Sequence, residues 1–534
     1  MKTLKKLFAL VATVATCLSL GATSVLAEGE STPTTGSITI NNASGDYAAY
    51  QVFSGTYNST TGTLGNITWG SGVTQFTFEI EKTENGTTTK ETTNDAAKIA
   101  EYLAKQLDNS EVVKNFADAA IAAKTSDSSN YYTASTNQNK AEFTSLPFGY
   151  YVVENTSVAP SKDSSGTQTD TTGAYTKFIL KVVGDATATN KASVPSMTKK
   201  VKDTNDSTGV TSDWQDSADY DIGDAVPFQL TGTVASNYAD YKTYYFAFHD
   251  VEETGLTFNP QSVVVKVDGE PITSGYEIKT TKKADDDNTT YSKPTDGCTF
   301  EVVFSNLKDI TSVHAGSVIT VDYNSTLNEN ANIGSQGNVN KAKLEFSNNP
   351  NEEQSGETKP GTGETPWDNV IVFTYQTVVN KVDQDGAALA GAEFTLEKYN
   401  ATEGKWVASK TATLNEAGTS FTFKGLDDGQ YRLTESKTPA GYNTCAPIKF
   451  TVTAEHTIEW DGTQRTAVLT SLTTTGIAST TNLSDGSLTS DVVNKKGSVL
   501  PSTGGMGTTI LYVTGAILML GAGVLLLSRR KMSK

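Results

Sequence analysis

Apolar and polar residues alternate in short runs along most of the chain, and Gly, Asn and Asp separate one run from the next. Alternation with a period of two predicts β-strands that bury one face. Clear examples are GDYAAYQVF at 45–53, LPFGYYVVE at 146–154 and FTFKGLDDGQYRLTE at 421–435. The pattern therefore predicts an all-β protein.

One window has helical spacing instead. It follows Asn94 and Asp95, either of which can cap a helix. Its apolar stripe comprises Ala97, Ile99, Ala100, Leu103 and Leu107. We expect one helical segment added to a β-rich N-terminal domain.

The strand-like runs fall into three blocks, which we place at 28–190, 195–350 and 367–497. The segment 351–366, NEEQSGETKPGTGETP, is rich in Gly, Pro and Glu and is typical of a linker. Repeated short strands with turns between them favour antiparallel sandwiches. We therefore expect tandem immunoglobulin-like β-sandwich domains.

The N-terminus has the features of a secretory signal. Lys2, Lys5 and Lys6 precede an apolar run that is followed by VLA, ending at Ala27. A basic region, a short apolar region and small residues at the exit predict cleavage after about residue 27. Residues 1–27 are thus expected to be a signal peptide on an exported protein.

The C-terminus carries an apolar stretch over 510–527 and then a basic tail containing Arg529, Arg530 and Lys531. Eighteen apolar residues are about enough to span a bilayer, and the basic tail would stay on the cytoplasmic side. This segment predicts a transmembrane anchor.

A pentapeptide, LPSTG, stands just before this stretch. It comprises Leu500, Pro501, Ser502, Thr503 and Gly504. With the apolar span and basic tail, residues 500–534 resemble the cell-wall sorting signal of Gram-positive surface proteins. The resemblance implies that the transpeptidase sortase cuts between Thr503 and Gly504 and joins the Thr503 carbonyl to an amine.

The chain has 534 residues and a formal charge of −18. Loss of the two terminal segments removes seven basic residues and no acidic one, so residues 28–503 carry −25. Such an acidic surface makes nucleic acid an unfavourable partner. Cys17 leaves with the signal, and the spacing of Cys298 and Cys445 does not establish a disulfide.

The third block contains VVNKVDQDGAALAGAEFTL, YRLTESKTPAGY and VVNKKG in that order. These segments resemble the opening strand, acidic box and closing strand of collagen-adhesin B-type domains in Gram-positive pilins. The resemblance implies a spontaneous isopeptide bond between Lys381 and Asn494, with Glu435 as the helper acid.

The chemistry of such a bond follows from burial. A buried Lys loses hydration and its neutral, nucleophilic amine becomes accessible, while a buried Glu tends to hold a proton that polarises the amide carbonyl. Contact between amine and amide supplies an effective concentration of up to about 10⁵–10⁸ M. One reaction releases ammonia and leaves a cross-link.

The second block, with PSMTKKVKD, FAFHDVEETGLTF and NVNKAKLEFSNNP, resembles the middle domain of backbone pilins. The resemblance implies an acid at Asp250 and an amide at Asn340. Lys199 and Lys200 compete as the amine. Strand alternation places Lys199 on the face of Val201, which we expect to be buried, and so favours Lys199.

Between these blocks the pilin family places a linking lysine in a Tyr-Pro-Lys setting. Here TNKASVP puts Lys191 at that position without the Tyr-Pro pair. The resemblance then implies that Lys191 of one subunit receives Thr503 of another.

We interpret the chain as the shaft subunit of a covalent surface pilus rather than an enzyme. The partners expected are a class C sortase, further copies of the chain, tip and basal pilins and peptidoglycan. No cofactor or metal is expected, because His249, His314 and His456 show no metal-binding spacing. Two alternatives are a monomeric wall-anchored adhesin, which does not need Lys191, and a carbohydrate-active enzyme, for which no carboxylate pair is evident.

Overall fold

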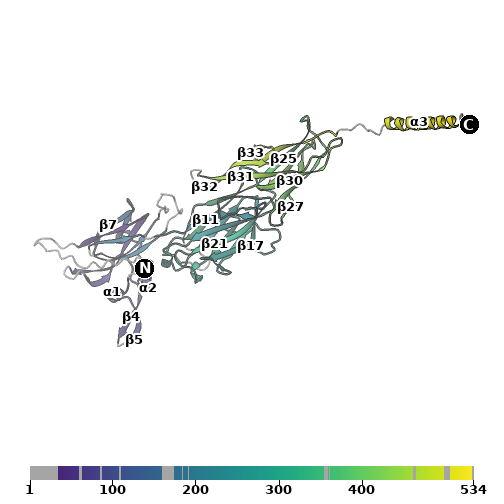
Figure 1. The fold of residues 1–534 in the computed structure, drawn as a ribbon. Coiled ribbons are helices and arrows are strands. Elements are labelled where there is room, and N and C mark those ends of the chain that lie inside the picture. Colours follow the sequence, from purple (N-terminus) through teal and green to yellow (C-terminus); the bar gives the residue numbers. More distant parts are fainter. Residues whose placement is uncertain are drawn as a thin grey trace, which may run out of the picture.

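The computed structural model arranges three β-rich blocks in a row, with a separate helix at the C-terminal end (Figure 1). The blocks here are groups of strands that share sheets and cores. The structure describes residues 34–58, 63–84, 87–107, 110–158, 174–182, 184–190, 192–353, 359, 361–460, 465–497 and 506–531.

The first block packs two sheets and two helices. One sheet has the order β10-β1-β7, the other has the order β3-β2-β8-β9 with β6 also on β2, and β4 and β5 form a hairpin. Its elements are β1 (Thr35–Asn41), β2 (Asp46–Asn58), β3 (Thr63–Trp69), β4 (Phe78–Glu84), β5 (Thr87–Thr93), α1 (Ala96–Leu103), α2 (Glu111–Ala122), β6 (Tyr131–Ser135), β7 (Lys140–Pro147), β8 (Gly149–Asn155), β9 (Lys177–Val182) and β10 (Asp185–Thr189).

The predicted helix exists, but its buried face and length differ from the prediction. Asp95 caps α1 by accepting hydrogen bonds from Ala97 and Lys98. The helix buries Ala96 and Ile99 and ends at Leu103, so Leu107 lies beyond it and is exposed. The prediction also missed α2, whose Phe116 packs on Phe53 of the sheet.

The second block is a sandwich of a β11-β15-β21-β17-β18 sheet and a β14-β24-β22-β16-β20-β19 sheet, with β23 on β22. Its elements are β11 (Ser196–Val201), β12 (Thr204–Asn205), β13 (Val210–Thr211), β14 (Ser217–Asp219), β15 (Ala225–Thr233), β16 (Phe246–Glu252), β17 (Leu256–Val267), β18 (Glu270–Ile272), β19 (Glu277–Thr280), β20 (Phe300–Phe304), β21 (Val318–Leu327), β22 (Asn338–Ser347), β23 (Thr362–Glu364) and β24 (Asp368–Phe373). Phenylalanines and tyrosines fill the space between the sheets.

Strand β24 corrects the predicted start of the third block at residue 367. It pairs with β22 and β14 and therefore belongs to the sheet of the second block. Val370 and Val372 point into the core of the second block, whereas Ile371 and Phe373 point into that of the third. The expected linker also contains β23, so the second block continues through residue 373.

The third block is a sandwich of a β28-β29-β25-β34-β33 sheet and a β27-β26-β30-β31-β32 sheet. Its first and last long strands, β25 and β34, are adjacent and parallel. Its elements are β25 (Tyr375–Asp383), β26 (Glu393–Asn400), β27 (Lys405–Ala408), β28 (Thr413–Leu414), β29 (Ser420–Leu426), β30 (Gly429–Lys437), β31 (Ile448–Trp460), β32 (Arg465–Thr475), β33 (Thr480–Asn482) and β34 (Ser487–Asn494).

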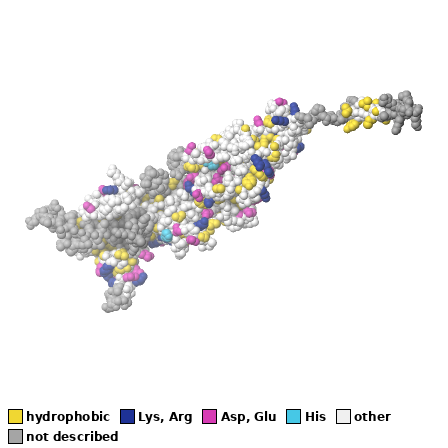
Figure 2. Space-filling view, viewed as in Figure 1, with side chains coloured by type: hydrophobic (Ala, Val, Ile, Leu, Met, Phe, Trp, Pro, Cys, Tyr) yellow, Lys and Arg dark blue, Asp and Glu magenta, His cyan; other side chains and the backbone are white. Residues whose placement is uncertain are grey.

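Helix α3 (Met506–Lys531) stands apart from the blocks, and apolar side chains such as Leu511 and Ile517 are exposed along it (Figure 2). Within the part of the chain that is described, no helix meets the length and hydropathy needed to cross a membrane. The predicted span at 510–527 includes positions whose side chains are outside that part. The predicted signal peptide, residues 1–27, lies entirely outside the described residues.

Candidate functional site

The structure brings Lys199, Asp250 and Asn340 together inside the second block. Lys199 comes from β11 in one sheet, and Asp250 and Asn340 come from neighbouring strands β16 and β22 of the other. All three side chains are fully buried. Since charged residues are almost never fully buried unless paired, this arrangement needs a specific explanation.

A fourth residue, Tyr323 of β21, connects the three. Lys199 Nζ donates to Asp250 Oδ2 at 2.5 Å and to the Tyr323 hydroxyl at 2.6 Å. That hydroxyl donates to Asp250 Oδ2 at 2.8 Å and accepts from Asn340 Nδ2 at 3.0 Å. Tyr323 thus holds the amine, the acid and the amide in one network.

Burial favours the neutral forms of the two ionisable partners. Loss of hydration lowers the pKa of Lys199, although the Asp250 carboxylate opposes this effect. The same loss raises the pKa of Asp250, against the opposing charge of Lys199. A neutral amine beside a protonated carboxyl is the pairing that nucleophilic attack on an amide requires.

Two oxygens of this site lack hydrogen bonds. Asp250 Oδ1 and the carbonyl oxygen Oδ1 of Asn340 are both buried without a partner. A buried acceptor without a donor costs about 1–3 kcal/mol. A proton on Asp250 Oδ1 provides a donor for an amide carbonyl, and such a bond would polarise the carbonyl toward attack.

The neighbouring lysine is in a different environment. Lys200 points away from the triad and forms an ion pair with Asp216 in a partly exposed position. The burial of Lys199, in contrast, matches the face predicted from strand alternation. Of the two lysines, only Lys199 contacts the acid at position 250.

The third block brings Lys381, Glu435 and Asn494 together. Lys381 on β25 and Asn494 on β34 lie two positions apart in the register of the parallel pair, on the same buried face. Glu435 reaches them from β30 of the facing sheet. Each of these side chains is at least 95% buried.

The contacts of this second triad differ from those of the first. Asn494 Nδ2 donates to Glu435 Oε1 at 2.7 Å. Lys381 Nζ donates to the carbonyl oxygens of Val492 and Val382, at 2.8 and 3.0 Å. Burial lowers the pKa of Lys381, and the Asn494 carbonyl oxygen has no hydrogen-bond partner.

Glu435 is itself held by the segment after β30. Its Oε2 accepts hydrogen bonds from the Cys445 backbone N–H at 2.9 Å and from the Thr438 hydroxyl at 3.2 Å. These contacts leave Oε1 directed at the amide of Asn494. The sequence motif YRLTESKTPAGY therefore supplies both the acid and part of its support.

The predicted intersubunit residues lie outside the described residues. These are Lys191 and the sorting motif from Leu500 to Gly504, including Thr503. The neighbours of Lys191 are described: the side chain of Asn190 is buried and accepts a hydrogen bond from the Ala192 backbone N–H at 2.7 Å. In the sequence, position 191 falls between β10 of the first block and β11 of the second.

Two family models match the chain. A prealbumin-like fold domain, SpaA, matches residues 376–466, and the LPXTG cell wall anchor motif matches residues 492–534. The first match covers most of the third block, including Lys381 and Glu435. The second covers Asn494 and the LPSTG sequence.

Known proteins also match the chain. The trypsin-resistant surface T6 protein of Streptococcus pyogenes serotype M6 is 27% identical over 410 residues, which cover 65% of this chain and 70% of that protein. The solved T6 backbone pilin of serotype M6 S. pyogenes has a TM-score of 0.53 and 19% identity, covering 88% of this chain and all of that one. The full-length major pilin SpaD of Corynebacterium diphtheriae covers 88% of this chain at 18% identity and a TM-score of 0.45.

Proposed function

We propose that this chain, a Gram-positive sortase-assembled backbone pilin with an LPXTG anchor, forms a shaft in which Thr503 of each subunit is bonded to Lys191 of the next. The chain is a structural subunit of a cell-wall-anchored surface pilus, and its function is mechanical. The sorting motif, the SpaA-type domain and the similarity to streptococcal T6 pilin support this assignment.

The observation that carries the proposed chemistry is the burial of two Lys–acid–Asn groups in separate sandwiches. In each, the Lys Nζ attacks the Asn Cγ and the bond between Cγ and the amide nitrogen Nδ2 breaks. One proton passes from the attacking amine to the leaving NH₂ group, which departs as ammonia. The acid relays that proton and ends in its starting form. Asp250 serves Lys199 and Asn340, and Glu435 serves Lys381 and Asn494.

Polymerisation uses a separate reaction. A sortase of class C first forms a thioester with Thr503 and releases the segment from Gly504 onward. The Lys191 amine of another copy then displaces the sortase thiol. Tip and basal pilins occupy the ends of the polymer, and peptidoglycan receives its base.

The intact mass of residues 28–503 tests the intradomain bonds. We expect a mass below the calculated value by two ammonia molecules, one for each bond. Asp250→Ala and Glu435→Ala should each restore one, whereas Lys200→Ala should restore none. An unshifted mass in the parent chain would rule out both bonds.

The intersubunit bond is tested in cells that assemble the pilus. Tandem mass spectrometry of polymer peptides should identify Thr503 joined to Lys191, and Lys191→Ala should abolish the ladder of SDS-resistant polymers. A ladder that persists in this variant would exclude Lys191 as the linking residue. A parent chain found as a wall-bound monomer would instead support the adhesin alternative.

A further inference from the structure

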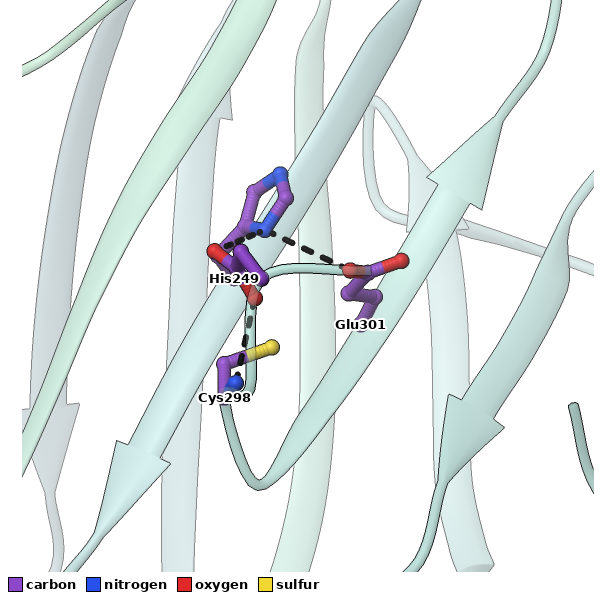
Figure 3. A group of neighbouring side chains, drawn as sticks. His249, Cys298 and Glu301 are labelled. Atoms are coloured by element: carbon purple, nitrogen blue, oxygen red, sulfur yellow. Dashed lines mark hydrogen bonds and ion pairs between the residues drawn. The ribbon is translucent and has the colours of Figure 1, made fainter. Parts of the chain in front are cut away.

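Four potential metal ligands converge on the second block, outside the Lys199 network. His249 lies on β16, Glu301 lies on β20, and Asp296 and Cys298 belong to the loop that leads into β20 (Figure 3). One ligand atom from each lies within 4.8 Å of every other. Figure 3 labels three of these residues, His249, Cys298 and Glu301. The histidine precedes Asp250 on β16, so the cluster lies on the opposite face of that strand.

The imidazole of His249 is buried, and both ring nitrogens face carboxylate oxygens without a well-aligned hydrogen bond. Asp296 Oδ2 is 3.0 Å and Glu301 Oε1 is 3.7 Å from Nδ1. Glu301 Oε1 accepts hydrogen bonds from the backbone N–H and the hydroxyl of Thr295, and the buried Oε2 lacks a hydrogen bond but lies 3.5 Å from Lys279 Nζ. A buried imidazole with poorly aligned partners, close to two carboxylates and a thiol, is a group of side chains that can bind a cation.

The contact of the second ring nitrogen of His249 also supports a cation-binding site. Glu345 Oε2 lies 3.3 Å from His249 Nε2, on the side away from Asp296 and Glu301. Metal-bound histidines almost always donate their second N–H to a carboxylate or a carbonyl group. Glu345 is held in place by Lys359 and the Thr362 hydroxyl, so it can fix the ring with Nδ1 facing the cluster.

We propose that His249, Asp296, Cys298 and Glu301 bind one Zn²⁺ ion. Imidazole nitrogen, thiolate sulfur and carboxylate oxygen are all ligands of tetrahedral zinc, at about 2.0–2.3 Å. The sulfur and nitrogen disfavour Ca²⁺, which prefers oxygen. Binding replaces the Cys298 thiol proton, which passes to solvent, and Asp296 at the partly exposed edge provides access.

The consequence of binding is local. Asp296 and Cys298 lie near the end of the loop between β19 and β20, whereas the other two ligands are on adjacent, paired strands. One ion would therefore fasten this loop to the sheet. This inference is independent of the pilus assignment, because the site uses neither the isopeptide triads nor the sorting motif.

Titration of purified residues 28–503 with ZnCl₂ and CoCl₂ tests the site. We expect one equivalent of Zn²⁺ per chain by calorimetry, and Co²⁺ should give an intense near-ultraviolet band from thiolate-to-metal charge transfer. Cys298→Ala should remove this band and weaken Zn²⁺ binding by at least about 100-fold. Cys445→Ala is the matched control, since it removes the other thiol of residues 28–503 and should change neither readout.

Asp296→Asn is a second variant, and because its position is partly exposed, we expect it to fold. It should weaken Zn²⁺ binding but preserve the charge-transfer band between the Cys298 thiolate and Co²⁺. CaCl₂ should produce no heat at this site. A parent chain that binds no Zn²⁺ overturns the proposal. So does Co²⁺ binding without the thiolate band, or a band that is lost in Cys445→Ala and retained in Cys298→Ala.

Discussion

The junctions at the two ends of the second block are built differently. At the junction with the first block, the contacts include the ion pairs Lys114–Asp240 and Lys242–Asp118, at 3.2 and 3.1 Å, and a backbone hydrogen bond from Tyr175 to Asn348. A cavity of about 500 Å³ remains between α2 and the segment around Pro350. This junction is polar and incompletely packed.

The junction with the third block is continuous. Strand β24 contributes one face to each core, as described above. Beside it, the buried Lys398 Nζ forms ion pairs with Asp221 of the second block and Asp427 of the third, both at 2.8 Å. The comparison indicates that the second and third blocks form one mechanical unit, to which the first block is joined more loosely.

Removing a shared aromatic side chain should have the largest effect. Phe373 is on β24, a strand of the second block, but its side chain packs in the core of the third block. Phe373→Ala leaves a cavity in that core and should lower the free energy of unfolding by about 4 kcal/mol. By differential scanning calorimetry, we expect the unfolding of both blocks to shift together. Phe116→Ala, the matched change in the first block, should leave that transition in place. If Phe373→Ala shifts only the unfolding transition of the third block, the second and third blocks do not unfold as one unit.

Removal of the buried cation should rank second. Lys398→Met leaves the carboxylates of Asp221 and Asp427 unpaired at a buried position, which should cost about 3 kcal/mol. Chemical denaturation followed by tryptophan fluorescence measures the loss. Adding Asp221→Asn to Lys398→Met should recover part of the lost stability, because one of the two unpaired charges is then absent. Wild-type stability in Lys398→Met would show that the cluster does not hold the blocks together.

The pH dependence should differ in sign between the two regions. Burial raises the pKa of Asp203 to about 6 and that of Asp219 well above its ordinary value, so the folded junction binds protons more tightly than the unfolded chain. Its stability should therefore fall by about 3 kcal/mol as the pH rises from about 4 through about 6. In the first block, hydrogen bonding to Lys82 lowers the pKa of Glu91, whose contribution is lost as the pH falls below about 4.5.

Thermal unfolding at about pH 3.5, about pH 5 and about pH 7.5 checks this difference, because the lowest value reaches the range in which the Glu91 contribution is lost. The transition of the second and third blocks should be higher at about pH 5 than at about pH 7.5, and Asp203→Asn should flatten the dependence. An equal slope in Asp203→Asn and the parent chain would exclude the buried carboxyl group of Asp203 as its source.

The smallest effect is expected at the looser junction. Lys242→Met removes partly exposed ion pairs with Asp118 and Glu353, and should change the free energy of unfolding by less than about 1 kcal/mol. Small-angle scattering should instead show a broader range of orientations of the first block. If Lys242→Met destabilises the chain as much as Lys398→Met, the two junctions are equivalent and the comparison fails.

Sequence patterns predicted the β-rich fold and the burial of Lys199 because both depend on a local period of two. The apolar run VIVF at 370–373 also contained a signal for β24, since strands buried on both faces are continuously apolar. Its place in the sheet of the second block could not be predicted, because that depends on pairing with β22, which is distant in the sequence.

The candidate sites show the same limit. Tyr323 occupies a buried position of β21, but nothing in its local sequence indicates that its hydroxyl meets residues from β11, β16 and β22. Likewise, His249 is 47 positions from Asp296, far outside the spacing of local metal motifs. Both sites are created by strand pairing, and their residues are recognisable only after the sheets are assembled.

The parallel pairing of β25 with β34 has a consequence for the length of the pilus. With the proposed Lys381–Asn494 bond closed, tension that enters the block at its first strand leaves through the neighbouring last strand. The 112 residues between them are then excluded from stretching. Fully drawn out, that segment would add roughly 370–400 Å for every subunit. A fibre made of such subunits is inextensible, and its reach from the cell surface is set by the number of copies joined.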